Sequence, residues 1–194
     1  MKKKVLSFVA AIFVAFSFTG CNDTDESVVG YASEDLLGIW EMVSCVYSGS
    51  SSVTSKGITN ESIYRGVFKN ISSNLIVLHN PNEIKVEGSY DIDLTYSILG
   101  GVSQKKTAFF TDISNTVDWS LRGDILTMSG VSFSLDIPID MGTIPETGTN
   151  ISQDFIVEEL TDSKLRIQTY SEKCIEASGV SSKIKTNMIL EFIR

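Results

Sequence analysis

The sequence predicts an all-β domain in which antiparallel strands form a sandwich or a barrel. Three observations support this fold class. Several segments alternate strictly between apolar and polar residues, turn signals rich in Gly, Asn, Asp and Ser recur between them, and no helical pattern runs longer than two turns. Together they indicate about eight to ten short strands. The chain contains only 3 prolines among 194 residues, which suits a strand-rich fold.

The first part of the domain combines one clear strand with two less regular segments. A helical turn is expected at 33–37, with Ser33 as its N-cap and acidic residues in its first turn. A strand follows at 39–47. Residues 48–56 are mostly Ser, Gly and Thr, and they predict a loop. Within 60–79 the pattern favours a short helix at 61–68 and a strand at 75–78.

The rest of the domain shows the clearest alternation. Asp91 to Ile98 is the best example, because its apolar residues all fall on one face. Tight turns are expected at 100–101, 123–124 and 162–163, and a long loop at 140–150. The remaining strands are expected at 84–90, 92–98, 107–113, 117–121, 125–128, 131–139, 155–160, 165–170 and 185–194.

The amino terminus has the pattern of a secretory signal. Three lysines are followed by an apolar run from Val5 to Phe18, which is too short to span a membrane. The next residues, up to Cys21, resemble the bacterial lipobox, in which the cysteine becomes the lipid-modified first residue of the mature protein. The resemblance implies a signal peptide at 1–20 and an anchor of several acyl chains on Cys21.

The residues after the cysteine are polar and acidic, and they predict a flexible tether at 21–33 ahead of a single β-barrel domain at 34–194. Asn22 is not the Asp that resembles an inner-membrane retention signal, so the resemblance implies sorting to the outer membrane. The acidic run is similar to a surface-export signal, but short acidic tethers also serve solubility. A periplasmic and a surface-exposed location therefore both remain open.

The charge of the chain makes some classes of binding partner unfavourable. The net charge is −8, and loss of Lys2, Lys3 and Lys4 with the signal peptide makes the mature chain more acidic still. Lys105-Lys106 is the only adjacent basic pair after the signal. This composition makes nucleic acid or anionic lipid headgroups poor candidate partners. The expected membrane contact is therefore the lipid anchor, and a monomer is favoured.

Two cysteines, Cys45 and Cys174, remain in the mature domain. Beyond the inner membrane a disulfide is permitted, and two cysteines allow a single pairing, which would tie the first strand to the last hairpin. The alternative is two small buried apolar side chains. The sequence leaves both interpretations open.

A family resemblance begins at Gly38-Ile39-Trp40. A G-x-W on the first strand after a helical turn resembles the first signature of the lipocalins, and 155–170 resembles the late hairpin of bacterial lipocalin-like lipoproteins. The resemblance implies an eight-stranded up-and-down barrel closed at one end by Trp40. It also implies that Arg194 packs across the Trp40 ring, where a cation–π contact is favourable.

The same resemblance implies a small apolar ligand, such as a lipid, in the barrel interior. The expected lining is aromatic: Tyr90, Tyr96, Phe109, Trp119 and Phe133. The loops at 48–58 and 140–152 are candidate lids. The alternative is an accessory or structural lipoprotein with a solid barrel, whose outer loops bind a protein or a glycan.

No set of residues predicts catalysis. The single histidine, His79, lies in a turn-forming Asn-Pro-Asn context, and no nucleophile motif or phosphate loop accompanies it. Asp91 and Asp93 share a strand face that is expected to face solvent, so a solubilising pair is favoured over a calcium site. We therefore expect a non-enzymatic protein with no cofactor and no metal site.

Overall fold

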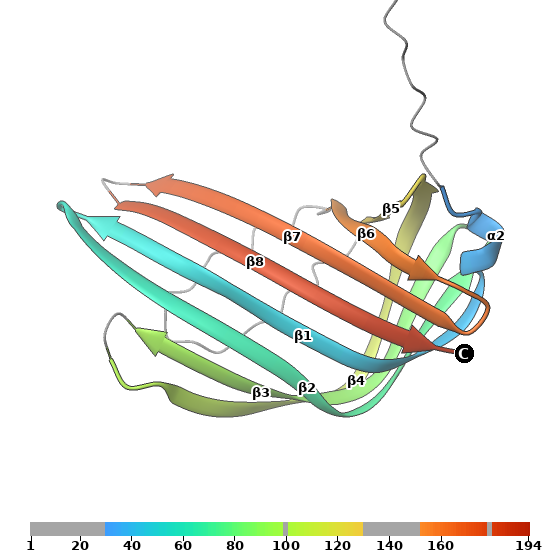
Figure 1. Cartoon of the computed structure of the whole chain (residues 1–194), viewed down its shortest axis with the longest axis horizontal. Coiled ribbons are helices and arrows are strands. Elements are labelled where there is room, and N and C mark those ends of the chain that lie inside the picture. Colours follow the sequence, from blue (N-terminus) through green and yellow to red (C-terminus); the bar gives the residue numbers. More distant parts are fainter. Residues whose placement is uncertain (1–29, 99–100, 130–151, 178–179) are drawn as a thin grey trace, which may run out of the picture.

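The computed structural model describes residues 30–98, 101–129, 152–177 and 180–194, and it confirms the all-β prediction. The described strands form a closed antiparallel barrel in which each strand pairs with its neighbours in sequence, and β1 pairs with β8 (Figure 1). This is the up-and-down topology that the family resemblance implies. The elements are α2 (Ser33–Leu36), β1 (Gly38–Ser55), β2 (Ile58–Leu78), β3 (Glu83–Ile98), β4 (Gln104–Arg122), β5 (Ile125–Ser129), β6 (Ser152–Leu160), β7 (Lys164–Ala177) and β8 (Val180–Ile193).

The described barrel wall has two parts, because the described residues of β5 end at Ser129 and those of β6 begin at Ser152. β4 pairs with β5 only over Asp118–Arg122, and β7 pairs with β6 only over Leu165–Gln168. Around these pairings the wall has eight strands, and we call this the eight-strand part. Toward the end of the barrel away from α2, the described wall consists of β4, β3, β2, β1, β8 and β7, and we call this the six-strand part (Figure 1).

The hydrophobic core fills the eight-strand part. Alternate residues of every strand point inward there, as the period of two requires. The largest fully buried side chains are Trp40, Phe155, Leu36, Ile84, Leu126, Leu165 and Ile167. The turn α2 lies across this end, and its buried Leu36 joins the same core (Figure 1). The helical turn was predicted, but its N-cap is Ala32 rather than Ser33.

The loop predicted at 48–56 is wrong, because β1 continues as a strand to Ser55 and pairs with both β2 and β8. Two glycines in the barrel wall explain how β1 and β2 stay paired in this segment. Tyr47 lies opposite Gly66, and Tyr64 lies opposite Gly49, so each tyrosine covers the glycine of its own pair. The two rings stack at 5.1 Å between centroids. We call this arrangement the tyrosine–glycine pair.

The helix predicted at 61–68 is also wrong, because β2 is one strand from Ile58 to Leu78. Its inward residues include Ser62 and Gly66, which carry little apolar signal, so the period of two was not visible. Asn70 adopts a left-handed φ of 49°, where the pairing of β2 with β3 shifts register. Near this bulge Gly88 has a φ of 132°, and a Cβ there would lie 2.0 Å from the Ser72 carbonyl oxygen.

Substitution of Gly49 by Ala tests the tyrosine–glycine pair. A Cβ at Gly49 would lie 2.2 Å from the Lys185 carbonyl oxygen and 2.4 Å from the Tyr64 hydroxyl oxygen. We expect Gly49→Ala to lower the free energy of unfolding by about 1–3 kcal/mol, since the strands must move apart to fit it. Urea unfolding measures this, with Ser50→Ala on the same strand as the control. Equal stabilities of the two variants would contradict the proposed close packing.

Candidate functional site

The three residues predicted to close the barrel lie together at the end covered by α2. The guanidinium carbon of Arg194 lies 4.2 Å from the centroid of the Trp40 ring, which is the predicted cation–π contact. The Trp40 indole N–H donates to the Leu36 carbonyl oxygen at 2.8 Å. Gly38 has a φ of 126°, which favours glycine, and the Arg194 Nη1 passes 3.4 Å from the position of a Cβ there.

Arg194 also joins the end of β8 to two other backbone segments. Its guanidinium donates to the carbonyl oxygens of Leu37 at 2.8 Å, Asp162 at 2.6 Å and Asp35 at 3.2 Å. These oxygens belong to the α2 segment and to the turn between β6 and β7. A planar group with five N–H donors suits such a role better than an ammonium group. Arg194 therefore ties the end of β8 to the covering turn and to a neighbouring hairpin.

The five aromatic residues predicted to line a ligand cavity do not form one group. Trp119 is buried in the eight-strand part and donates its indole N–H to the Leu78 carbonyl oxygen at 2.9 Å. Tyr90 and Tyr96 are half-buried against the core cluster, and the Tyr96 hydroxyl donates to the Gln104 side chain. Phe133 lies outside the described residues.

The prediction for Phe109 is wrong. Its side chain is 72% exposed on the outer face of β4, opposite Asp91 of β3. The neighbouring Phe110 takes the inward position, opposite Tyr90. Two consecutive phenylalanines give no indication from sequence alone of which one faces inward, and a left-handed residue at Asp112 interrupts the alternation farther along the strand.

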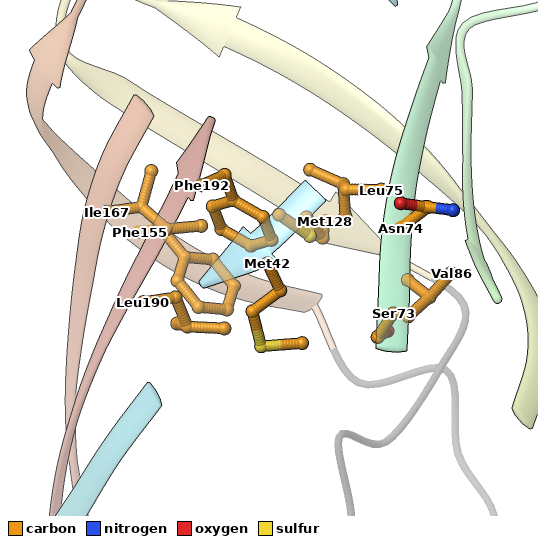
Figure 2. Close-up of a pocket in the computed structure, with 10 residues that line it drawn as sticks. All are labelled: Met42, Ser73, Asn74, Leu75, Val86, Met128, Phe155, Ile167, Leu190 and Phe192. Carbon is orange, nitrogen blue, oxygen red and sulfur yellow. The ribbon is translucent and has the colours of Figure 1, made fainter. Parts of the chain in front are cut away.

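The described eight-strand part contains a small apolar cavity of about 20 Å³. Figure 2 shows its lining, which is Met42, Ser73, Asn74, Leu75, Val86, Met128, Phe155, Ile167, Leu190 and Phe192. None of the five predicted aromatic residues belongs to this lining. The volume suffices for about one water molecule, whereas ligand pockets measure about 300–1,000 Å³. This cavity is therefore a packing defect rather than a ligand site.

A different aromatic group lies on the inner face where the six-strand part begins. We call it the aromatic inner surface, and it consists of Tyr47, Tyr64, Phe68, Tyr90 and Phe110. Phe68 stacks on Tyr90 at 4.4 Å between centroids, and Tyr90 meets Phe110 at 5.2 Å. Of these five residues, only Tyr90 was predicted from the sequence to line the interior. Tyr64 and Phe68 were missed because the inward Ser62 and Gly66 of β2 obscure the alternation that would have indicated them.

Burial disfavours ionisation of two tyrosines of the aromatic inner surface. Burial raises the pKa of Tyr90 to about 12, and the nearby Cys45 adds to the rise. Burial also raises the pKa of Tyr47, and its neighbour Tyr64 contributes. The Tyr64 hydroxyl donates to the Lys185 carbonyl oxygen at 2.9 Å. Farther along β1 and β2 the inward residues become the buried serines Ser51 and Ser62, so an apolar surface is followed by hydroxyl groups.

The disulfide between Cys45 and Cys174 is not formed, and both thiols are free. Cys45 is buried inside the barrel opposite Leu190 of β8, whereas Cys174 is exposed opposite Lys183. Those two β8 positions are separated by about 23 Å at about 3.3 Å per residue. A disulfide needs Cα atoms within about 7 Å. The second interpretation, a small buried apolar side chain, therefore describes Cys45 but not Cys174.

The boundary of the predicted tether needs a correction. The Tyr31 backbone N–H donates to the Gly123 carbonyl oxygen at 3.2 Å, and the Tyr31 side chain packs against the core cluster. The chain is thus fixed to the eight-strand part from Gly30 onward, before the predicted end of the tether at Ser33. Residues 1–29, including Cys21, lie outside the described residues. Among the described helices, none is long and apolar enough to cross a bilayer.

The acidic pair Asp91 and Asp93 is held by neighbouring side chains. Asn70 donates to Asp91 at 2.5 Å, and Lys69 forms an ion pair with Asp93. Hydrogen bonds from Lys69 and then Thr107 lower the pKa of Asp93. Within the described ranges, no three His, Cys, Asp or Glu side chains gather in a way that would hold a metal ion.

Replacement of Arg194 tests the closure contact. A lysine keeps the charge but cannot reach three carbonyl oxygens at once, so we expect Arg194→Lys to lower the midpoint of thermal unfolding by roughly 2–6 °C. The control is Arg166→Lys, because Arg166 forms ion pairs with Glu158 and Glu191 on the outer wall, where such pairs contribute little. A larger decrease for the control than for Arg194→Lys would contradict this role.

Alkylation of the two thiols tests the cysteine assignment. Burial raises the pKa of Cys45 to about 12, so its thiol should stay protonated and protected at neutral pH. In the native protein a maleimide should modify Cys174 alone, and Cys45 should react only after unfolding. Peptide mass spectrometry identifies the modified residue. A mass increase of about two daltons on reduction, before any alkylation, would instead reveal a disulfide.

The chain was also compared with known proteins. Searches against protein-family models, curated protein sequences and solved structures found no match.

Proposed function

We propose that this chain is a non-enzymatic lipoprotein of the bacterial outer membrane, anchored through Cys21, whose barrel binds one small apolar ligand. The anchor is supported by the lipobox-like sequence and by the polar, acidic residues that follow it. The resemblance to lipocalins at Gly38, Trp40 and Arg194 supports a ligand-binding role. The geometry of these three residues agrees with what that resemblance implies.

The observation that carries the ligand proposal is the aromatic inner surface. Tyr47, Tyr64 and Phe68 belong to the hydrophobic core cluster, and the other two members of this surface are partly buried against it, at the boundary of the described six-strand part. Tyr90 and Phe110 are only half-buried there, so parts of their rings remain accessible. Apolar pockets with a few hydroxyl groups are typical of small-molecule sites. Ser51 and Ser62 supply such groups farther along the same face.

This surface favours a flat or extended apolar ligand over a compact polar one. Aromatic rings contribute large apolar areas and prefer stacked or edge-on contacts with other rings. Hydroxyl groups from one side would orient a single polar group of the ligand. The barrel thus acts as a holder, and we assign no bond-making step to any of its residues.

A second candidate function is an accessory lipoprotein with a solid barrel. The specific observation in its favour is the tight packing of the described interior, where the cavity in the eight-strand part measures about 20 Å³. The aromatic rings also stack on one another, which satisfies part of their contact area. The two candidates differ in whether a molecule occupies the aromatic inner surface.

Neighbouring phenylalanines offer a matched test of the ligand site. Phe110 faces inward and Phe109 outward, so Phe110→Ala removes part of the proposed site while Phe109→Ala makes the same change on the outer face. Native mass spectrometry of residues 27–194, purified from the host, should show a bound small molecule. We expect Phe110→Ala to lower the affinity for palmitic acid or a component of host lipid extract at least tenfold, and Phe109→Ala to leave it unchanged.

Circular dichroism checks that both variants are folded at the assay temperature. An unoccupied wild-type protein that binds neither palmitic acid nor host lipids would favour the accessory lipoprotein. Binding that Phe110→Ala and Phe109→Ala weaken equally would place the ligand elsewhere.

A further inference from the structure

Three hairpins end at the far end of the six-strand part, away from α2 (Figure 1). Each carries an exposed aliphatic side chain three residues before a lysine in the sequence. We call these tips the far rim, which consists of Val53, Lys56 and Ile58 of the β1–β2 hairpin, Val102, Lys105 and Lys106 of the β3–β4 hairpin, and Val180 and Lys183 of the β7–β8 hairpin. The exposed fraction reaches 67% at Ile58 and 88% at Val102.

The tips of the far rim belong to one surface. Ser55 at the end of β1 pairs with both Ile58 of β2 and Val180 of β8, so the first and third hairpins are adjacent. Val53 lies two residues before Ser55 and therefore on the same face of β1. The β3–β4 hairpin ends at the same end of the barrel (Figure 1).

The opposite end has different chemistry. Its described connections are His79 to Asn82, Gly123-Asp124 and Thr161 to Ser163, and none of them contains an aliphatic side chain other than the ring of Pro81. Exposed isoleucines also lie near the other end, at Ile39 and Ile193, so the far rim is distinguished by a lysine that follows an exposed valine by three residues on each of its three hairpins.

The charges are also unevenly distributed. Among the described residues, the far rim and the strand segments beside it carry Lys56, Lys105, Lys106, Lys183 and Lys185, against the acids Glu61, Asp93, Glu172 and Glu176. Lys183 and Lys185 form ion pairs with Glu172 at 2.6 and 3.7 Å. In the part of the chain that the structure describes, the excess of acidic residues lies near the other end, at Glu34, Asp35, Glu41, Glu83, Glu87, Asp118, Asp124, Asp154, Glu158, Glu159, Asp162 and Glu191.

The distance between the ends separates these two charge regions electrostatically. β1 alone runs 18 residues from Gly38 to Ser55, which corresponds to about 55–60 Å at about 3.3 Å per residue. The Debye length at physiological ionic strength is about 8 Å. The acidic end therefore does not cancel the attraction of an anionic surface for the far rim, although the whole chain is acidic.

We infer that the far rim is a contact surface for an anionic lipid bilayer. Lysines beside exposed aliphatic side chains are the combination that binds the headgroup region, because apolar burial and attraction to anionic lipids add. A soluble polyanion would use the lysines alone and would leave Ile58 and Val102 exposed to water. This inference depends neither on the proposed ligand nor on the lipid anchor.

Vesicle flotation tests this inference without the anchor. The protein is the unacylated mature chain, residues 21–194 with Cys21→Ser, mixed with vesicles of phosphatidylcholine alone or of equimolar phosphatidylcholine and phosphatidylglycerol. We expect about tenfold stronger binding to the anionic vesicles, and weaker binding as salt increases. Absence of binding to the anionic vesicles would overturn the inference.

Charge-neutral substitutions separate a bilayer from a polyanion. We expect Ile58→Ser with Val102→Ser to weaken vesicle binding by about tenfold, because the apolar contact is lost while the charge is unchanged. The matched control is Ile39→Ser with Ile193→Ser, which changes two exposed isoleucines near the other end. Thermal unfolding of both variants ensures that they are folded.

Three further results would overturn the inference. Vesicle binding that the far-rim pair of substitutions leaves unchanged would indicate a purely electrostatic site for polyanions. Binding that the control pair weakens to the same extent would show that the contact does not lie at the far rim. Lys56→Gln with Lys105→Gln should reduce the difference between anionic and neutral vesicles, and an unchanged difference would also contradict the proposal.

Discussion

The six-strand part depends on the tyrosine–glycine pair between β1 and β2. β1 there is rich in Ser and Gly, which have low strand propensity and offer little apolar area. Tyr47 and Tyr64 supply that area from neighbouring positions, because each ring lies over a glycine that leaves room for it. The Tyr64 hydroxyl also bonds to the backbone of β8, so a single side chain joins three strands. Without this contact β1 would lose the packing that keeps it paired on both sides.

The proposed ligand site and the proposed bilayer contact both rely on the strands that this contact holds. The aromatic inner surface continues from the Tyr47–Tyr64 stack to the Phe68–Tyr90–Phe110 row, and the far rim lies at the ends of the same strands. The eight-strand part has a different role. Its core is closely packed and its end is tied by Arg194, so it supplies a rigid base from which the longer strands extend. Stability and recognition are thus assigned to different parts of one sheet.

The sequence predicted the fold where large apolar residues alternate with polar ones, as in β3. It failed where the inward residues are small or polar, because Gly49, Ser51 and Ser62 give no apolar signal although they face inward. The closure contact was predicted through a family resemblance, since Arg194 and Trp40 are far apart in sequence. The orientation of Phe109 and Phe110 could not be predicted, because one residue of register decides which ring faces inward. Cys45 and Cys174 showed the same limit, since their separation along β8 is a property of strand pairing.

The charge of the chain illustrates the same point at larger scale. The net charge of −8 predicted that the chain binds anionic lipids poorly, and this prediction holds for a surface on which the charges are evenly spread. Folding, however, brings Lys56, Lys105 and Lys183 from three separate hairpins to one end, while most of the acidic residues that the structure describes lie near the other. Since screening limits each charge to its own neighbourhood, the local arrangement decides what each end attracts. The described chain begins at Gly30, at the acidic end, where the Tyr31 N–H bonds to Gly123, so the far rim lies at the opposite end of the strands from this entry point.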